Sequence, residues 1–465
     1  MSTTQRDFTK GPIARGMIAF SMPFLLSNIL QALYGAVDMY VVGNYSDADP
    51  AVCATILSGV TMGSQITHLV AMMVSGLTVS GTVMVGQYIG ARKPKDASQT
   101  VGTMFSLLFI VGVVLTAVMM ALSGPILRLL NTPDDAFAHA QSYLNICLSG
   151  TLFIFGYNAI SSIQRGLGDS IRPLIFVGVA CVVNIALDLW LVKGLHMGAA
   201  GAAWATVIAQ AVSLILAAWY LSRSRFIFDF RPRSFRIHRD KMNMMVRLGI
   251  PSSVQSIIVN ISFLVMIALV NIISNNETAP SAAVGVVGKF NSFAILPAVA
   301  MSSSVSAFAA QNIGAGKIDR ARKCLNVGMI LALLISGLVF AAVQLFPEAV
   351  IELFNKDPET IRCGKEYMLT FSFDYLLVPI QFCLNGLVMG AGHTRFTMLS
   401  SCLSSLVLRI PVAVLFGSVL SWGLTGVGLA APAATLAGVA LTAWFVVSGR
   451  WKKNQTGIHA EPETT

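Results

Sequence analysis

The sequence predicts an all-α integral membrane protein with twelve transmembrane helices in two six-helix lobes, related by a pseudo-two-fold axis along the membrane normal. Three observations predict it: the composition, a series of charge-poor stretches, and an internal repeat. Of the 465 residues, 55% are hydrophobic and only 11% are charged, whereas soluble chains carry about 25% charged residues. The composition therefore excludes a set of soluble domains and indicates that most of the chain lies in lipid.

The charge-poor stretches are each long enough to cross the ~30 Å hydrocarbon core as a helix. The second and eighth are long for one crossing, and we expect them to tilt or protrude. Because the start of the chain is polar and lacks a cleavage signal, the first stretch is expected to be a retained span. We expect the spans near 16–43, 51–88, 97–123, 138–163, 172–192, 198–221, 245–273, 281–312, 322–345, 367–388, 396–420 and 424–448.

Charges in the connecting loops predict the orientation. Most of the 31 Lys and Arg residues fall in alternate connections, with a dense group between Arg223 and Arg247, while the other connections collect acids such as Asp47, Asp134 and Glu348. By the positive-inside rule, both termini are expected to be cytoplasmic in a multi-pass protein of the cell inner membrane. The net charge of +10 thus predicts contact with the membrane surface and no nucleic-acid partner.

The two halves of the chain repeat each other with a period of about 224 to 229 residues. Val85-Gly-Gln-Tyr-Ile-Gly-Ala91 recurs as Ala309-Ala-Gln-Asn-Ile-Gly-Ala315, and Pro23 recurs as Pro251. Six spans per repeat insert both copies the same way up, which predicts a parallel pair of bundles. The expected domains are an N-terminal lobe at 1–221, a cytoplasmic linker at 222–244, a C-terminal lobe at 245–450 and a polar tail at 451–465.

One carboxylate stands out inside the first span. No Asp, Glu, Lys or Arg occurs from Gly16 to Val37, and Asp38 follows with an apolar run beyond it. A charged side chain at membrane depth costs about 2.5–3.5 kcal/mol or more, so it persists facing a partner or a polar cavity. Pro23 removes a backbone donor and lets this helix kink. A kinkable helix with a buried acid predicts a moving part of an ion-coupled transporter; the alternative is an acid that caps the outer helix end.

The fifth span carries a second acid. Asn184 and Asp188 are four residues apart and so share a helix face, and Asn158 and Thr206 offer further oxygens from neighbouring spans. Such a group can hold Na⁺, or the two carboxylates can share a proton; the residues leave both possibilities open. A salt bridge from Asp188 to Lys193 is the structural alternative.

The second half has different charges at the corresponding places. Lys289 and Arg409 lie within spans, and we expect them to pair with Asp374 or with backbone carbonyls, with cavity lining as the alternative. Asp374 is expected to cap the start of the tenth span. The sequence has no phosphate-binding loop and no metal-spaced Cys/His cluster. It therefore predicts no enzyme and no cofactor beyond Na⁺ or H⁺ as the coupling ion.

The motifs together resemble the multidrug and toxic compound extrusion (MATE) family over essentially the whole chain, and within it the DinF-like branch. The resemblance rests on five segments: Pro23 with Asp38-Met-Tyr-Val-Val-Gly43, Gln87-Tyr-Ile-Gly-Ala91, Arg165-Gly-Leu-Gly-Asp-Ser-Ile-Arg-Pro173, Asn184-x3-Asp188, and Gly198 to Thr206.

The resemblance implies the roles of particular residues. It makes Asp38, Asn184, Asp188 and Thr206 the coupling-ion ligands, with the Ala202 carbonyl contributing. Asn158 would belong to the same network, and Pro23 would be the bending point. The NorM-like branch has an acid in span seven that this chain lacks, whereas Asp374 matches an acid that some relatives carry in span ten.

The leading hypothesis is a monomeric secondary antiporter that exports bulky cationic or amphipathic compounds in exchange for Na⁺ or H⁺. The alternative is a lipid-linked precursor flippase of a related superfamily. A flippase should line its cleft with several basic residues to hold a pyrophosphate, and only Lys289 and Arg409 qualify here.

Overall fold

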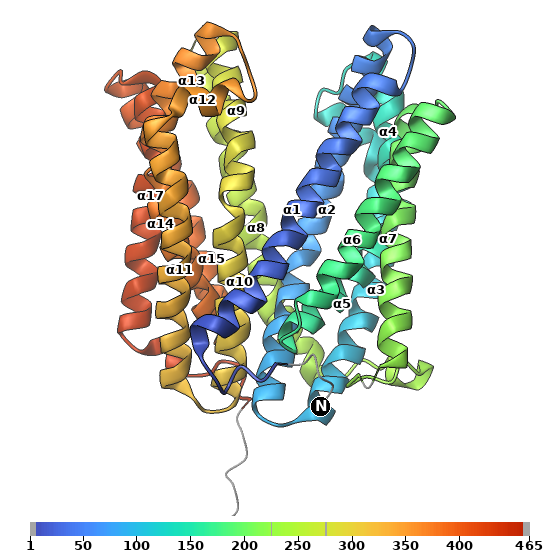
Figure 1. Ribbon diagram of the computed structural model, residues 1–465, viewed down its shortest axis with the longest axis vertical. Helices are drawn as coiled ribbons and strands as arrows, with labels where there is room; N and C mark the ends of the chain where they lie inside the picture. Colours follow the sequence, from blue (N-terminus) through green and yellow to red (C-terminus); the bar gives the residue numbers. More distant parts are fainter. Residues whose placement is uncertain (1–5, 225, 275–276, 459–465) are drawn as a thin grey trace, which may run out of the picture. The chain divides into compact units, whose positions relative to one another are not determined.

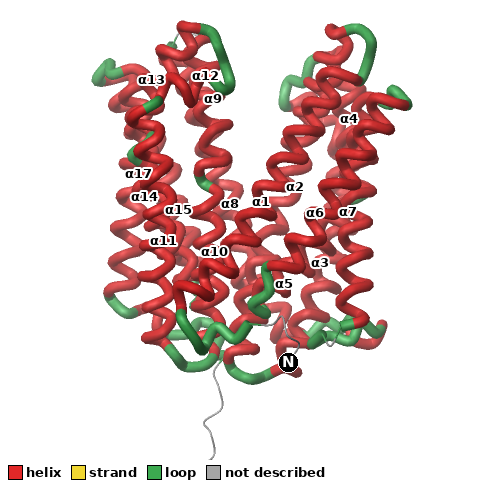
Figure 2. Tube along the Cα trace, in the orientation of Figure 1, coloured by secondary structure: helices red, strands yellow, loops and turns green. Residues whose placement is uncertain are grey.

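The computed structural model describes residues 6–224, 226–274 and 277–458. Residues 1–5 of the expected N-terminal lobe, Arg225 of the expected linker and 459–465 of the expected tail lie outside this description. Throughout the described ranges the regular structure is helical (Figure 2). The α-helices are α1 (Ile13–Tyr45), α2 (Pro50–Gly90), α3 (Pro94–Leu129), α4 (Asp134–Ser149), α5 (Thr151–Gly166), α6 (Ile171–Asp188), α7 (Gly198–Arg223), α8 (Arg239–Ile273), α9 (Thr278–Ala294), α10 (Leu296–Gly314), α11 (Ile318–Leu345), α12 (Pro347–Glu352), α13 (Pro358–Phe371), α14 (Asp374–Gly390), α15 (Thr394–Cys402), α16 (Arg409–Val414) and α17 (Gly423–Val447).

Five short helical turns complete the description. Three are π-helical, namely η1 (Leu189–Gly194), η3 (Leu403–Leu408) and η4 (Leu415–Val419). Two are 3₁₀ turns, η2 (Pro232–Ser234) and η5 (Arg450–Lys452). Of the π-helical turns, η3 lies inside an apolar span, whereas η1 and η4 form the ends of their spans. Such turns often accompany function.

By length and composition, ten helical segments of the described chain can cross a membrane, and two bent pairs raise this number to twelve. The bent pairs are α4 with α5, bent by 50°, and α13 with α14, bent by 45°. They correspond to the fourth and tenth predicted spans. The bends fall at Gly150 and just before Asp374, one repeat period apart, so the internal repeat extends to the distortions of the helices.

The helices cluster into two compact units. Of the described residues, unit 1 holds Arg6, Leu26–Val85 and Lys93–Gly249, and unit 2 holds Asp7–Leu25, Gly86–Arg92 and the chain from Ile250 onward. Helix α1 is thus divided between the units, and Pro23 lies inside it just before the change. A proline cannot donate the intrahelical hydrogen bond to the carbonyl four residues earlier, so the helix is weakest to bending there.

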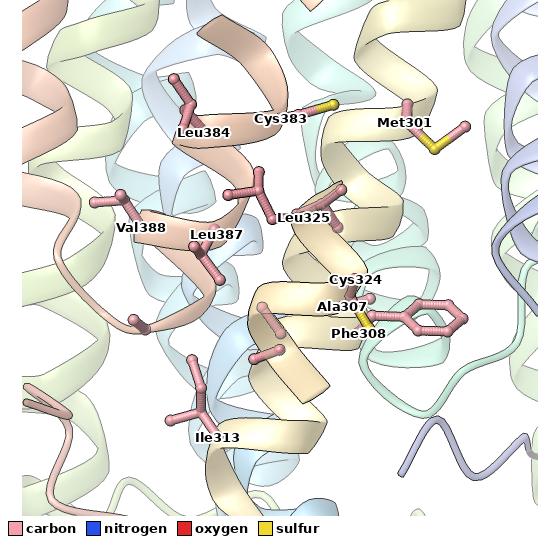
Figure 3. Packing of buried hydrophobic residues seen from close by; sticks show 14 of the residues in the cluster. Met301, Ala307, Phe308, Ile313, Cys324, Leu325, Cys383, Leu384, Leu387 and Val388 are labelled. Atoms are coloured by element: carbon pink, nitrogen blue, oxygen red, sulfur yellow. The ribbon is translucent and has the colours of Figure 1, made fainter. Parts of the chain in front are cut away.

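The core of unit 2 is built mainly on α10, α11 and α14, which pack against one another (Figure 1). Phe308 of α10 lies fully buried within it (Figure 3). Its ring stacks on Phe8, with the centroids 3.7 Å apart. Small residues such as Ala307 and Cys383 let the helices approach closely, as is common in membrane bundles.

The repeated Gln-x-Ile-Gly-Ala motif has a structural explanation inside unit 2. A side chain on Gly90 would overlap the Gln311 carbonyl, and one on Gly314 would overlap the Gln87 carbonyl. The two helix ends therefore meet backbone to backbone, which only glycine allows. The Gln87 amide donates to the Gly390 carbonyl (2.7 Å), and the Gln311 side-chain oxygen accepts from the backbone N–H of Phe8 (3.0 Å).

Unit 1 has two core clusters. One joins Val41 and Val42 of α1 to Ala202 and Ala203 of α7, together with residues of α2, α4 and η1. The other joins α5, α6 and α7, and α6 and α7 lie side by side (Figure 1). The first cluster packs the C-terminal part of α1, which carries Asp38, against α4 and α7.

Candidate cation site

Asp38 and Asp188 lie together in unit 1. Asp38 comes from α1 and is 8% exposed, while Asp188 is the last residue of α6 and is fully buried. Their carboxyl groups lie close enough to interact electrostatically with each other. Because α1 continues to Tyr45, Asp38 lies inside the helix and does not cap its end.

The helix changes form at Asp188. Helix α6 ends there, and the π-helical turn η1 begins at Leu189. Asn184 lies one turn earlier on the same face and is 1% exposed. A π-helical turn widens the backbone and redirects the side chains next to it. Asn184 and Asp188 themselves lie within α6 one turn apart, so the α-helix places the amide and the carboxyl group on one buried face.

The polar atoms of this place lack protein partners. Within the described chain, no hydrogen bond is recorded for Oδ1 of Asp38, either carboxylate oxygen of Asp188, or either amide atom of Asn184, although all are buried. Buried polar groups are almost always satisfied in folded proteins. Two interacting carboxylates also repel each other when both are charged. The arrangement therefore calls for a shared proton or for a small cation held by oxygen atoms.

Further polar groups surround Asp38 that the sequence did not single out. Tyr34 lies one turn before Asp38 on α1, and its hydroxyl is 3.5 Å from the side-chain nitrogen of Gln210 on α7. Tyr143 and Cys147, one turn apart on α4, are also within electrostatic range of Asp38. The four-residue spacings of Tyr34 with Asp38 and of Tyr143 with Cys147 were available signals, because such residues share a helix face.

The other residues expected at the site are less closely joined to it. Ala202 is fully buried and packs against the apolar neighbours of Asp38. Thr206 lies one turn further along α7, and Asn158 lies on α5; both are half-buried. Over the described ranges, no hydrogen bond joins Thr206 or Asn158 to either acid.

The alternative role for Asp188 was a salt bridge to Lys193, and the described residues do not form it. Lys193 instead places its ammonium over the ring of Tyr45, with Nζ 4.5 Å from the ring centre. Among the residues that the structure describes, no ion pair joins Lys193 to Asp188. The charged group that interacts with the carboxylate of Asp188 is Asp38.

Unit 2 holds a separate pair of buried charges. Asp374, 5% exposed, begins α14 at the bend within the tenth span, and Arg409, 7% exposed, begins α16. The two groups attract each other electrostatically without a direct ion pair in the described chain. The guanidinium of Arg409 also lies over the ring of Phe263, 4.7 Å from its centre. Lys289 on α9 is exposed and is not joined to this pair.

The donor types at the first site suit a hard monovalent ion or a proton. Carboxylate and amide oxygens are ligands of hard cations, and no group of three or more His, Cys, Asp or Glu side chains within metal-binding reach occurs in the described ranges. The geometry thus supports exchange of a small cation at a buried acid pair in a twelve-span helical protein.

Comparison with known proteins decides the family. The MatE family model matches residues 23–190 and 251–415, one block in each half of the chain. The chain belongs to the MATE family. This assignment confirms the family predicted from the motifs, and MATE proteins are transporters and not enzymes.

Relatives extend the match to nearly the full length. A probable multidrug resistance protein of Bacillus subtilis, YpnP, is 29% identical over 96% of this MATE chain and 97% of its own. A probable multidrug resistance protein NorM of Thermotoga maritima is 26% identical over 95% and 94%. A solved MOP superfamily transporter from Pyrococcus furiosus has a TM-score of 0.89 at 21% identity, covering 97% of this chain and 100% of that one. The last likeness confirms the twelve-helix, two-lobe fold.

Proposed function

We propose that this MATE-family chain is a secondary active antiporter that exports bulky cationic or amphipathic compounds in exchange for Na⁺ or H⁺. The observation that carries the proposal is the buried pair of Asp38 and Asp188. Oδ1 of Asp38 and both carboxylate oxygens of Asp188 lack hydrogen-bond partners in the described chain. Relatives named as multidrug resistance proteins support the substrate class. In this proposal the chain acts as a monomer in the cell inner membrane with both termini cytoplasmic.

Coupling follows from competition for one conformational equilibrium. The ion neutralises the acid pair and favours the state in which the pair is buried. The exported cation favours the other state, because it supplies the positive charge that the pair needs. Each ligand then shifts the same two-state equilibrium in opposite directions, and the coupling is reciprocal.

The residues divide by role in this scheme. Asp38 and Asp188 bind the ion directly, with Asn184 as a neutral oxygen ligand. Thr206, Asn158 and the Ala202 carbonyl complete the network when α7 and α5 close on it. If the ion is Na⁺, its ligands are Asp38, Asn184, Asp188 and Thr206. Pro23 is the point at which α1 bends to move Asp38 toward or away from the others.

Efflux from cells tests the proposal. Cells that express Asp38→Asn or Asp188→Asn should retain a fluorescent cationic compound as control cells without the transporter do. Asp49→Asn is the matched control, because Asp49 is exposed and an asparagine there still accepts the hydrogen bond that Asp49 takes from Ala51. Wild-type efflux by either acid variant would remove the pair from the mechanism.

The flippase alternative is not favoured. A lipid pyrophosphate would need several buried basic groups, whereas the site described here is acidic. Purified protein should therefore bind a cationic dye and not an anionic lipid phosphate at the site that contains Asp38.

A further inference from the structure

An apolar cavity of about 690 Å³ lies in unit 1, away from the acid pair. It lies among α3, α5 and α7 and is bounded at one end by the polar segment 222–244, hereafter the linker. Its volume is in the range of sites that hold small molecules. Its walls are almost entirely hydrocarbon and include Phe105, Phe109, Phe155, Leu214, Phe235 and Ile237.

The linker is fixed to α3 where it borders the cavity. The Thr103 hydroxyl donates to the Arg236 carbonyl (3.3 Å) and accepts from the backbone N–H of His238 (3.1 Å). A side chain on Gly102 would overlap the Ser234 carbonyl, so the linker backbone lies directly on the helix. Lys241 forms an ion pair with Asp96 at 2.6 Å. The end wall of the cavity is therefore a defined part of the structure.

Aromatic rings join the linker to the cavity wall. The ring centre of Phe105 lies 6.0 Å from that of Phe228, 6.1 Å from that of Phe230 and 5.9 Å from that of Phe235. Phe235 and Ile237 themselves remain 40% and 39% exposed. Both side chains therefore offer apolar surface at the mouth of the cavity.

The charge at this mouth is positive. Arg231, Arg233 and Arg236 are exposed, and Arg236 separates the two lining residues of the linker. Asp229 partners Arg231 at 3.8 Å, and a hydrogen bond from Ser234 holds the pKa of that acid below its usual value. Arg233 and Arg236 form no recorded ion pair within the described chain, so two exposed arginines lie within two residues of Phe235, which lines the cavity.

We propose that this cavity binds one acyl chain of an anionic phospholipid, whose phosphate pairs with Arg233 and Arg236. The apolar walls gain from covering hydrocarbon, and guanidinium groups bind phosphate in bidentate geometry. A transported cation would be repelled by the same arginines, and free phosphate would leave the apolar walls uncovered. The occupant that satisfies both features is an anionic amphiphile.

Binding of this lipid has a consequence for the linker. The lipid contacts α3, α5 and α7 with its chain and the linker with its head group, so it stabilises the docked position of the linker. A ligand that binds only the folded, docked state raises its stability by mass action. This inference is independent of ion exchange at the acid pair.

Lipid binding by the purified full chain tests the proposal. The probes are phosphatidylglycerol and phosphatidylcholine with identical acyl chains, titrated into delipidated protein in detergent and counted by native mass spectrometry. Phosphatidylglycerol should bind at least tenfold more tightly. Arg233→Gln and Arg236→Gln together should weaken phosphatidylglycerol by about fivefold for each arginine and leave phosphatidylcholine unchanged.

Two control comparisons separate charge from shape. Arg322→Gln with Lys323→Gln removes the same charge from exposed positions of α11 and should leave the lipid preference intact. Ser106→Trp fills the cavity and should weaken both lipids, whereas Leu338→Trp, at a residue 73% exposed in unit 2, should weaken neither.

Several results would overturn the proposal. Equal binding of the two lipids would show that the arginines do not bind the phosphate. Wild-type lipid binding by Ser106→Trp would show that the acyl chain does not occupy the cavity. Displacement of the lipid by a cationic dye would make the cavity a substrate site, and equal binding of inorganic phosphate would show that the apolar walls contribute nothing. If the double arginine variant fails to fold, Arg236→Gln alone against Arg236→Lys gives the same comparison.

Discussion

Asp38, two turns before the end of α1, and Asp188, at the end of α6, form an interacting pair of buried carboxyl groups in unit 1. Among the described residues no ion pair joins either acid to a basic group, and Lys193 lies over the ring of Tyr45. A buried pair of like charges is unfavourable by itself, so its presence points to an exchangeable positive charge. Four predictions follow from this pair, the hinge before it, the charges of unit 2 and the repeated glycines.

The Asp188→Asn variant should keep its stability without the ion and lose the stabilisation that ion binding gives. The asparagine removes the repulsion, so the variant should unfold at the same or a higher temperature than the wild type. It should also lose the stabilisation that the coupling ion gives, which at a hundredfold excess over the dissociation constant is about 2.7 kcal/mol. Thermal unfolding measured across Na⁺ concentrations and across pH tests both expectations, with Asp49→Asn as control. An ion response equal to that of the wild type would count against the pair.

Pro23→Ala should slow transport without weakening ion binding. Alanine restores the backbone hydrogen bond to the Ala19 carbonyl and stiffens α1, while Asp38 lies four turns further along and keeps its neighbours. Turnover of a fluorescent cation in vesicles and the ion dependence of unfolding measure the two effects separately. Unchanged turnover would argue against a hinge at this residue, and a loss of ion binding would assign the proline a role in the site itself.

Arg409→Met should destabilise the protein more than the same change combined with Asp374→Asn. The single change leaves the buried Asp374 without its balancing charge, and breaking a buried charge pair costs about 3–5 kcal/mol when the groups touch. These two groups attract each other without forming a direct ion pair. We therefore expect a coupling free energy of about 1–3 kcal/mol between the two substitutions. The free energy of unfolding of both single variants and the double variant gives the coupling. Additive effects would show that the two charges are independent.

Gly90→Ala and Gly314→Ala should each destabilise the protein by ~1–3 kcal/mol, the range for overpacking a tight contact. In both cases the added methyl group would overlap a backbone carbonyl, which cannot move aside as a side chain can. Gly285→Ala is the matched control, because nothing lies within 4 Å of the position its methyl group would take. Thermal unfolding of the three variants in one detergent measures the difference. Equal melting temperatures for all three would contradict the backbone contact.

Much of the fold follows from the sequence because each span is a long apolar run, and the lipid fixes the length and form of such runs. The bend at Gly150 and the change to a π-helical turn after Asp188 could not be read in this way. They depend on how neighbouring helices pack, and apolar patterning carries no signal for them. The expectation that Asp374 caps the start of the tenth span was wrong. That span begins with α13, and Asp374 is the first helical residue of α14, with no side-chain capping hydrogen bond there.

The acidic pair was accessible from sequence because a charge inside an apolar run is costly wherever the run is buried. Tyr34 was not singled out, although it lies one turn from Asp38 on the same helix. Tyr143 was not singled out because only the fold brings it near Asp38. The cavity beside the linker was also inaccessible. It depends on contacts of Thr103 and Gly102 in α3 with a segment more than a hundred residues later in the chain.

The most direct test of the account is gradient-driven uptake by the purified protein in vesicles. A fluorescent cation should accumulate when either a Na⁺ gradient or a pH gradient of the exchanging direction is imposed, and the gradient that succeeds identifies the ion. Asp38→Asn and Asp188→Asn should abolish this accumulation while Asp49→Asn preserves it. Accumulation by the two acid variants at the wild-type rate would contradict the claim that Asp38 and Asp188 exchange the coupling ion.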